Sequence, residues 1–391
     1  MTFDAAQVAF ANPIELYLEI SPTAQNQAWQ QSQSFSTSAS GYQAYLNQLC
    51  LAAVLPWLRE EYEPQAHPWP NASALPSYWE VVNGIAVTVD AARFILIPSE
   101  TIDLSELRVP QEWIDIPSWA ADYYLAVQVE PDENWVRVWG YSTHQQLKTT
   151  GSYEASDRTY CLASDKLIQD MNILWVARQL CPDEATREAI SPLTTLPLAQ
   201  AENLLQRLGN PAITTPRLAV PFELWGALLE HGGWRQHLYE RRIGLPEQWS
   251  IQKWLRAGVS DFAQQIGWGR IEFQQGFIGV KGAEPTDVEA VLSRRLLIAG
   301  QQYELRVLAQ GNLEEPIWRF ELRNSSTGGL IPGGFKLRLL TEDLQAFENN
   351  EDVALTAQEQ LYIDVSLAPR EGLVWETEPL PENYDREILR F

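Results

Sequence analysis

The alternation of apolar and polar positions divides the first half of the chain into helical and extended stretches. Residues 23–63 repeat apolar side chains at helical spacing and predict two helices, broken at 38–42 by the sequence SASGY. Residues 78–162 instead contain short β-branched and aromatic runs bounded by Gly, Pro, Asn or Asp. These runs predict a small antiparallel barrel or sandwich, with a hairpin turn at 131–134.

Helical spacing returns over residues 165–208, so residues 1–215 together predict an N-terminal α+β domain. Short, evenly spaced strand-like runs dominate the end of the chain and predict a C-terminal antiparallel β-sandwich over residues 276–391. A tryptophan-rich helical connector, residues 216–275, lies between the two. The predicted fold class is therefore α+β.

The connector twice contains an apolar helix followed by glycine and then tryptophan, at Trp234 and at Trp268. A glycine just beyond a helix commonly adopts the left-handed conformation that ends it. We therefore expect Gly232 or Gly233, and likewise Gly267, to terminate helices. Each indole is expected to seal the helix end against the core.

The tripeptide His231-Gly-Gly raises a catalytic alternative, because it also opens the oxyanion loop of many esterases. That loop follows a strand, and its enzyme needs a GxSxG elbow. The residues before His231 have helical spacing, and no GxSxG occurs in the chain. With His67, His144 and His237 as the only other histidines, the sequence favours a helix end.

The net charge limits the kinds of binding partner, and the cysteine content indicates the cellular compartment. The chain has 51 acidic and 28 basic residues and a formal charge of -23, which would repel a phosphate backbone, so no nucleic-acid partner is expected. The three cysteines form no CxxC pair, which indicates a reducing compartment. The N-terminus lacks a basic leader region, and the longest apolar run, LCLAAVLPWL, is too short for a membrane span. We expect a cytoplasmic protein.

Motifs for cofactors and metals are missing from the sequence. GWGRIE at Gly267 lacks the third glycine of a dinucleotide loop, no Walker A lysine occurs, and the six-residue spacing of His231 and His237 does not fit a zinc-binding HExxH. We therefore expect no cofactor, no metal and no assignable catalytic residue. A hydrolase site assembled from distant carboxylates and histidines stays open as an alternative, and a structure would reveal it as a deep pocket with perturbed pKa values.

Sixteen tryptophans point towards binding rather than catalysis. Tryptophan and arginine are enriched at the energetic centres of protein interfaces. Trp249, Trp254 and Arg256 lie close together in the connector and are the candidate partner-binding residues, provided that the fold leaves them partly uncovered. Exposed tryptophans on either β domain would alternatively bind a carbohydrate or another small ligand.

Four stretches resemble a cyanobacterial family of unknown function that is identified only by a domain number. They are AYLNQLCLAAVLPWL, YYLAVQVEPDENWVRVWGYSTHQQL, WSIQKWLRAGVSDFAQQIGW and EGLVWETEPL, and the likeness runs from the first helix to the C-terminal strands. The resemblance implies a cyanobacterial cytoplasmic protein with a regulatory role linked to sigma factors or signalling proteases. It implies no catalytic residue.

Taken together, these patterns favour a non-catalytic, protein-binding or regulatory scaffold whose partner is another protein. A flat apolar patch on the surface would support this function over the hydrolase alternative. The oligomeric state stays open.

Overall fold

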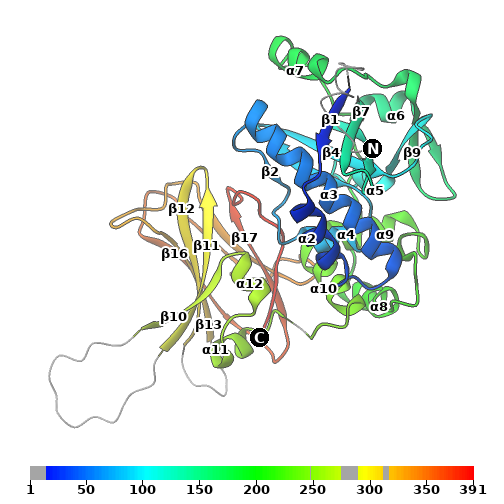
Figure 1. Ribbon diagram of the computed structural model, residues 1–391. Coiled ribbons are helices and arrows are strands. Elements are labelled where there is room, and N and C mark those ends of the chain that lie inside the picture. The colour runs from blue at the N-terminus through cyan, green and yellow to red at the C-terminus, as the bar shows by residue number, and fades with distance from the viewer. Residues whose placement is uncertain (1–14, 247, 274–288, 311–316) are drawn as a thin grey trace, which may run out of the picture. The chain divides into compact units, whose positions relative to one another are not determined.

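The computed structural model describes residues 15–246, 248–273, 289–310 and 317–391, and the chain divides into two compact units (Figure 1). The N-terminal unit is Met1–Gly244 and the C-terminal unit is Leu245–Phe391. Helices and sheets both occur, which confirms the α+β class. The predicted connector 216–275 contributes helices to both units, and its expected end at residue 275 lies outside the described residues.

A six-stranded sheet forms the centre of the N-terminal unit. Its strands are β1 (Leu16–Glu19), β2 (His67–Pro68), β3 (Ile85–Val89), β4 (Ala92–Ser99), β6 (Tyr123–Glu130) and β7 (Trp135–Thr143). The order across the sheet is β1-β7-β6-β4-β3-β2, and all neighbours pair antiparallel except β4 and β6. β6 and β7 form the hairpin predicted at 131–134. β6 is buried along almost its whole length, as expected of a strand that is covered on both faces.

A smaller antiparallel sheet and two short helices follow in the same unit. The strands are β5 (Glu106–Pro110), β8 (Ser152–Glu154) and β9 (Thr159–Ala163), in the order β5-β9-β8. Helix α5 (Gln111–Asp115) contacts β5 and β9, and helix α6 (His144–Thr150) contacts β7 and β9.

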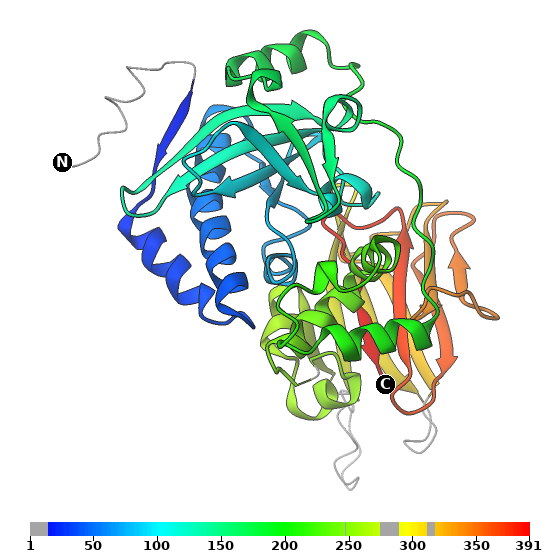
Figure 2. The same cartoon turned by 90° about the vertical axis from the view of Figure 1, so that its right-hand side faces the viewer.

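Two helices, α2 (Pro22–Ser32) and α3 (Ser38–Glu61), lie in the sequence between β1 and the other strands of the six-stranded sheet. The predicted break at 38–42 is wrong, because these residues form the first turn of α3. Thr37 Oγ1 accepts a hydrogen bond from the Ser40 N–H, and Ser40 Oγ accepts one from the Thr37 N–H. This reciprocal capping fixes the start of α3, which then packs against β3, β4, β6 and β7 (Figure 2).

The other helices of this unit are α4 (Leu75–Trp79), α7 (Met171–Leu180), α8 (Leu198–Leu208), α9 (Phe222–Glu230) and α10 (Gly232–Arg242). The helical pattern predicted over 165–208 is present as α7 and α8, but residues 181–197 between them are irregular. Figure 2 shows this segment running along the side of the unit. Arg187 attaches it to Asp122 through two hydrogen bonds of 2.8 and 2.7 Å.

His231-Gly-Gly begins a helix, so the predicted C-cap at Gly232 or Gly233 is wrong. Both glycines belong to α10, and His231 is the one residue between α9 and α10. His231 Nδ1 accepts a hydrogen bond of 3.3 Å from the Trp234 N–H, as an N-cap does. The second prediction is confirmed, because Gly267 has φ +106° just after helix α12 (Asp261–Gln265).

The C-terminal unit is a β-sandwich, as predicted. One sheet contains β10 (Trp268–Phe273), β11 (Glu289–Ile298), β12 (Gln301–Gln310), β13 (Ile317–Asn324) and β16 (Gln360–Ser366), in that order. The other contains β14 (Lys336–Thr341), β15 (Glu351–Val353), β17 (Gly372–Glu378) and β18 (Ile388–Arg390), in the order β15-β14-β17-β18. All the pairs within these sheets are antiparallel.

Alternation along strands such as β12 and β16 contributes to the core of the sandwich. On β12, Leu305 and Val307 are buried, whereas Glu304 and Arg306 between and beside them face outward. Helix α11 (Ile251–Ala257) adds Ile251 and Trp254 to the same core, and α12 adds Ala263. Trp249, just before α11, and Trp268, at the start of β10, belong to the same core. No helix among the described residues is both long and apolar enough to cross a bilayer.

Candidate functional site

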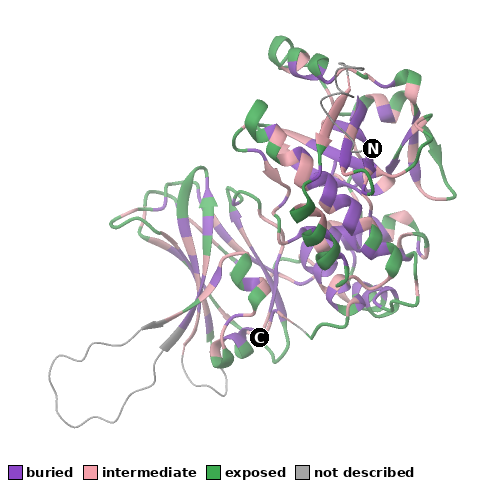
Figure 3. Cartoon of the chain, in the orientation of Figure 1, coloured by how far each residue is buried: buried purple, intermediate pink, exposed green. Residues whose placement is uncertain are grey.

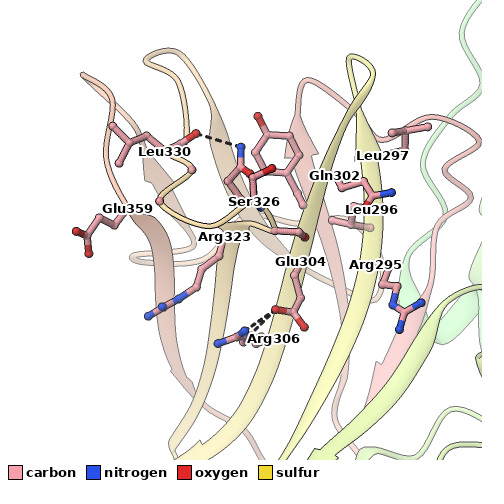
Figure 4. Close-up of a pocket in the computed structure, with 15 residues that line it drawn as sticks. Arg295, Leu296, Leu297, Gln302, Glu304, Arg306, Arg323, Ser326, Leu330 and Glu359 are labelled. Atoms are coloured by element: carbon pink, nitrogen blue, oxygen red, sulfur yellow. Dashed lines mark hydrogen bonds and ion pairs between the residues drawn. The ribbon is translucent and has the colours of Figure 1, made fainter.

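A groove of about 780 Å³ opens on the outer face of the five-stranded sheet in the C-terminal unit (Figure 4). It is lined by the end of β11, the start of β12, the end of β13 and the loop that follows β13. Its charged residues are Arg295, Glu304, Arg306, Arg323 and Glu359, and we call it the arginine groove.

Strand register places the charges of the arginine groove in rows across the sheet. Arg295 on β11 lies opposite Glu304 on β12, which lies opposite Arg323 on β13. In the neighbouring row, Arg306 lies opposite Glu321. Opposite charges therefore face each other across the strands, and the ion pairs themselves run along a strand, from Arg306 to Glu304 and from Arg323 to Glu321.

Three of these charged groups already have polar partners: Glu304 and Arg306 pair with each other, and Arg323 pairs with residues outside the groove. Arg306 donates to Glu304 Oε2 from Nε at 2.7 Å, and its Nη2 lies 2.6 Å from the same oxygen. Ser293 donates to the other oxygen of Glu304. Arg323 is held by Glu321 and Gln360. A carboxylate with both oxygens occupied is poorly placed to activate a water molecule, so Glu304 suits a structural or binding role.

Arg295 differs from the other arginines of the groove. Its side chain is exposed, and it has no hydrogen bond or ion pair with any residue that the structure describes. Figure 4 shows it at one side of the groove, across β12 from Arg323. A guanidinium presents several donors in a planar fork that fits a carboxylate. Arg295 is therefore the group best placed to receive an acidic group from a ligand.

The loop 325–330 forms a wall of the arginine groove and depends on its glycines. The Asn324 side chain donates to Leu330 O at 3.4 Å and accepts from the Ser326 N–H at 2.9 Å. A Cβ at Gly329 would come within 2.5 Å of Asn324 Oδ1, and Gly328 has φ +72°. Side chains at these two positions would therefore displace the wall.

The partner-binding residues predicted from the sequence lie elsewhere in this unit. Trp249 is 8% exposed and Trp254 is 2% exposed, and both belong to the core. Their ring centroids are 5.9 Å apart, and Trp254 Nε1 donates to Gln248 O at 2.8 Å. The condition set for an indole anchor, partial exposure, is not met, and Arg256 is the exposed member of the three.

The groove residues carry a sequence signal that could have revealed them. The tripeptide Glu-Leu-Arg occurs at 304–306 on β12 and again at 321–323 on β13. Antiparallel pairing of two such strands brings each Glu opposite the Arg of the other, as the register of β12 and β13 shows. The pattern therefore predicts a charged, outward-facing sheet surface, provided that the two strands are known to be neighbours.

A second hollow, of about 340 Å³, lies in the N-terminal unit beside Asp115 and Lys148. Lys148 Nζ donates to Asp115 Oδ1 at 2.7 Å and to the Tyr160 hydroxyl at 3.0 Å. Burial acts to lower the pKa of Lys148, but these hydrogen bonds raise it above its usual value. Burial raises the pKa of Tyr160. Both groups therefore keep their protons at neutral pH and do not act as general bases, and both oxygens of Asp115 already accept hydrogen bonds.

The described part of the chain holds its histidines in structural positions. His144 is fully buried, with Nε2 2.9 Å from Ile114 O and Nδ1 accepting from the Glu188 N–H at 3.0 Å. His237 accepts a hydrogen bond from Arg241. Among the described residues, no group of three or more His, Cys, Asp or Glu side chains could hold a metal ion.

The surroundings of His144 predict how stability depends on pH. Burial lowers the pKa of His144 below its ordinary value, so the unfolded chain takes up a proton before the folded one does. We expect the free energy of unfolding to fall as the pH drops from about 7 to 5.5, because unfolded histidine titrates near about 6.5. Urea unfolding at several pH values measures this slope. The slope should shrink in His144→Gln and persist in His67→Gln, and equal slopes in both variants would contradict the prediction.

Comparison with known proteins identifies one family. The family model described as DUF1822, protein of unknown function, matches residues 18–390. No curated protein and no solved structure matches the chain.

Proposed function

The chain belongs to the DUF1822 family, whose description assigns no function, and we propose that it is a non-catalytic protein that binds an extended segment of another protein in the arginine groove. One observation carries the proposal. Within the groove, Glu304 and Arg306 are paired with each other, whereas the Arg295 side chain is exposed and makes no hydrogen bond or ion pair with the described residues. The groove thus offers the Arg295 charge for recognition, while its Glu304–Arg306 pair is already satisfied.

The spacing of the groove fits an extended polypeptide. Neighbouring strands lie about 4.8 Å apart, so Arg295 and Arg323, two strands apart in one row, are separated by about 10 Å at the backbone. An extended chain repeats its side chains on one face every 6.5–7 Å or so. It can therefore place a carboxylate on Arg295 and further polar side chains along the Arg–Glu rows.

The hydrolase alternative finds less support in the described residues. It requires a carboxylate or histidine that is free to move a proton. Both oxygens of Glu304 are hydrogen-bonded, both ring nitrogens of His144 contact backbone groups, and the hydrogen bonds of Lys148 keep it protonated. These arrangements favour binding over hydrolysis.

The carbohydrate-binding alternative depends on exposed indoles. In the C-terminal unit, all five tryptophans are buried, the most exposed being Trp249 at 8%. Trp29, in the N-terminal unit, is 54% exposed, but it lies on α2 rather than on a sheet and packs edge-on against Tyr45. The C-terminal sheets therefore present no stacking platform of exposed tryptophans in their described parts, which favours a protein ligand.

We further propose a cytoplasmic location and a regulatory role. The three cysteines are free, and Cys181 is exposed, which suits a reducing compartment. The charge of -23 suits a basic partner surface, such as a region of a sigma factor or a signalling protease. A pull-down at low salt that retains neither class of protein would remove this regulatory link.

Substitution of Arg295 tests the binding function. We expect the tagged protein, purified from its native host, to retain one protein in stoichiometric amount, and Arg295→Glu to lose it because the rim charge is reversed. Arg256→Ala is the matched control, since Arg256 is also exposed, lies in the same unit and is outside the groove. Quantitative mass spectrometry of the retained proteins is the measurement.

Two results would count against the groove. Retention of the same protein by Arg295→Glu would show that the groove is not the contact surface, and loss of the protein by Arg256→Ala alone would move the surface to the tryptophan-rich helix. Thermal unfolding of each variant shows whether the fold is kept.

A further inference from the structure

Helix α7 of the N-terminal unit is apolar on two opposite faces. Its inner face buries Leu174 and Trp175, and the Trp175 ring stacks on Tyr62 with centroids 3.7 Å apart. Its outer face carries Ile173, Val176 and Leu180, which are 50%, 52% and 76% exposed. A surface helix normally turns charged or polar side chains to solvent, so an outer face of this kind is unusual.

The three outer residues form one continuous strip, which we call the α7 stripe. Their spacing, i, i+3 and i+7, places them on one side of the helix over about 10 Å of its length. Asn172 and Gln179, which are also exposed on α7, are uncharged. Figure 3 shows that exposed positions run along α7. Single apolar side chains on a surface need no explanation, whereas a contiguous apolar strip is typical of an interaction site.

The charges at the two ends of the α7 stripe are negative. Asp170 caps the start of the helix, and Asp183 and Glu184 are exposed just beyond its end. A hydrogen bond from the Glu184 N–H to Cys181 O holds this acidic turn next to the last turn of α7. The carbonyl end of the helix adds a partial negative charge at the same place.

The one basic residue of α7 is directed towards the protein. Arg178 donates to Val89 O at 3.2 Å and lies 3.7 Å from Asp90, and its guanidinium is 5.5 Å from the centre of the Phe94 ring. The stripe is therefore an apolar surface with acidic ends and no cation of its own helix facing outward.

We propose that the α7 stripe docks an amphipathic helix of a partner protein, with apolar residues at i, i+3 or i+4 and i+7 and with Lys or Arg at both ends. The apolar face of that helix would cover Ile173, Val176 and Leu180, as in other helix-to-surface recognition. Its basic ends would meet Asp170 on one side and Asp183 and Glu184 on the other. This surface is separate from the arginine groove and gives the protein a second binding site.

Charge also argues against other occupants. An antiparallel second copy of α7 would bring its Asp170 against Asp183 and Glu184, so like charges would meet at both ends. An anionic lipid surface would be repelled by the same acidic residues. A partner helix with basic ends is the occupant that fits the charges.

A displayed library of helical peptides with randomised charged and apolar positions tests the proposal on the full chain at low salt. We expect selection to enrich basic peptides with an apolar period of i, i+3 or i+4 and i+7. Enriched peptides should bind at least about tenfold more weakly to Ile173→Gln/Val176→Gln, because that variant removes the apolar centre of the stripe. Glutamine keeps a high helix propensity, and the inner face of α7 is untouched.

Three control variants distinguish peptide binding at the α7 stripe from non-specific hydrophobic binding and from binding at the arginine groove. Leu355→Gln removes an even more exposed leucine, 89% exposed and in the C-terminal unit, and should bind the peptides as the unmodified chain does. Asp183→Asn/Glu184→Gln should weaken binding and reduce its salt dependence. Arg295→Glu should leave peptide binding unchanged, so failure of the groove and failure of the stripe are distinguishable.

Several outcomes would overturn the proposal. They are the absence of enrichment, enrichment of acidic or non-periodic peptides, and equal binding by Ile173→Gln/Val176→Gln. Dimerisation that this variant abolishes would assign the stripe to a second copy, and binding to anionic vesicles that it abolishes would assign the stripe to lipid. Peptide binding that appears only after residues 2–14 are deleted would assign it to the chain's own N-terminus.

Discussion

Arg242→Met is expected to lower the free energy of unfolding of the N-terminal unit by about 3–5 kcal/mol, because it leaves a buried charge without its partner. The side chains of Arg242 and Glu80 are 1% and 0% exposed, and Arg242 Nε donates to Glu80 Oε1 at 2.7 Å. The same guanidinium donates from Nη1 to the carbonyl of Leu208, at the end of α8, at 2.9 Å. The substitution therefore also leaves a helix end without a donor.

The loss of Arg242 affects several elements together. Nη1 also donates to Ile213 O at 3.2 Å, and Nη2 donates to Ser36 Oγ at 3.1 Å, just before α3. Glu80 accepts hydrogen bonds from both the backbone and the side chain of Ser36. One arginine thus joins α10, the end of α8, the residue after α4 and the turn that leads into α3.

Urea unfolding followed by circular dichroism measures this loss of stability. Arg241→Met is the matched control, since Arg241 is adjacent and exposed, and it should change stability by no more than about 0.5 kcal/mol. The double variant Glu80→Leu/Arg242→Met should be less destabilised than the sum of its two single changes, because the charges are removed together. A loss below about 1 kcal/mol in Arg242→Met would contradict the prediction.

Glu387→Leu is expected to destabilise the C-terminal unit by a similar amount, about 3–5 kcal/mol. Glu387 is 4% exposed, and its Oε2 accepts from Trp268 Nε1 at 2.8 Å and from Trp375 Nε1 at 3.2 Å. Its Oε1 accepts from Arg294 Nε at 3.1 Å. Leucine would leave one cation and two buried indole donors unsatisfied, and each such group carries a desolvation cost.

A conservative change at the same position separates the contributions. Glu387→Gln keeps an acceptor for the indoles but removes the charge opposite Arg294, so its loss of stability should fall between those of the unmodified chain and Glu387→Leu. Glu348→Leu alters an exposed carboxylate in the same unit and should change stability little. Equal stability of Glu387→Leu and Glu348→Leu in urea unfolding would show that the buried carboxylate is not needed.

Both units satisfy buried tryptophan N–H groups with a buried glutamate that is paired with an arginine. In the N-terminal unit, the fully buried Glu112 accepts from Trp225 Nε1 at 2.8 Å and from Arg217 at 2.9 and 2.7 Å. In the C-terminal unit, Glu387 accepts from two indoles and an arginine. Tryptophan is the largest side chain for a core, but its N–H needs an acceptor, and a buried carboxylate paired with arginine supplies one.

Local patterns predicted the elements of this fold better than its long-range contacts. The alternation in YELRVL and IWRFELRN was enough to predict strands of a sandwich, and Gly267 was correctly placed at a helix end. The same glycine rule gave a wrong prediction at Gly232 and Gly233, because the side chain of the preceding His231 caps a new helix that contains both glycines. Glycine is a poor helix former in isolation, and the packing of α10 overrides that preference.

The candidate sites could be predicted only in part, since they depend on which strands become neighbours. The sequence shows Glu-Leu-Arg twice, but the row Arg295–Glu304–Arg323 exists only once β11, β12 and β13 lie side by side. The exposure of Ile173 and Val176 could not be predicted either. Helix α7 carries apolar residues on both faces, and the sequence alone does not say which face is covered. Trp249 and Trp254 are buried, so these two side chains do not meet the condition of partial exposure that was set for partner binding.

The packing of indoles in the C-terminal unit has an optical consequence. The ring of Trp254 lies 5.9 Å from that of Trp249 and 5.5 Å from that of Trp268, measured between centroids, with the planes tilted by 47° and 51°. Chromophores this close and skewed couple their electronic transitions, so the folded unit should carry near-ultraviolet circular dichroism bands that separated indoles lack. These circular dichroism bands therefore report whether the core of the β-sandwich is packed.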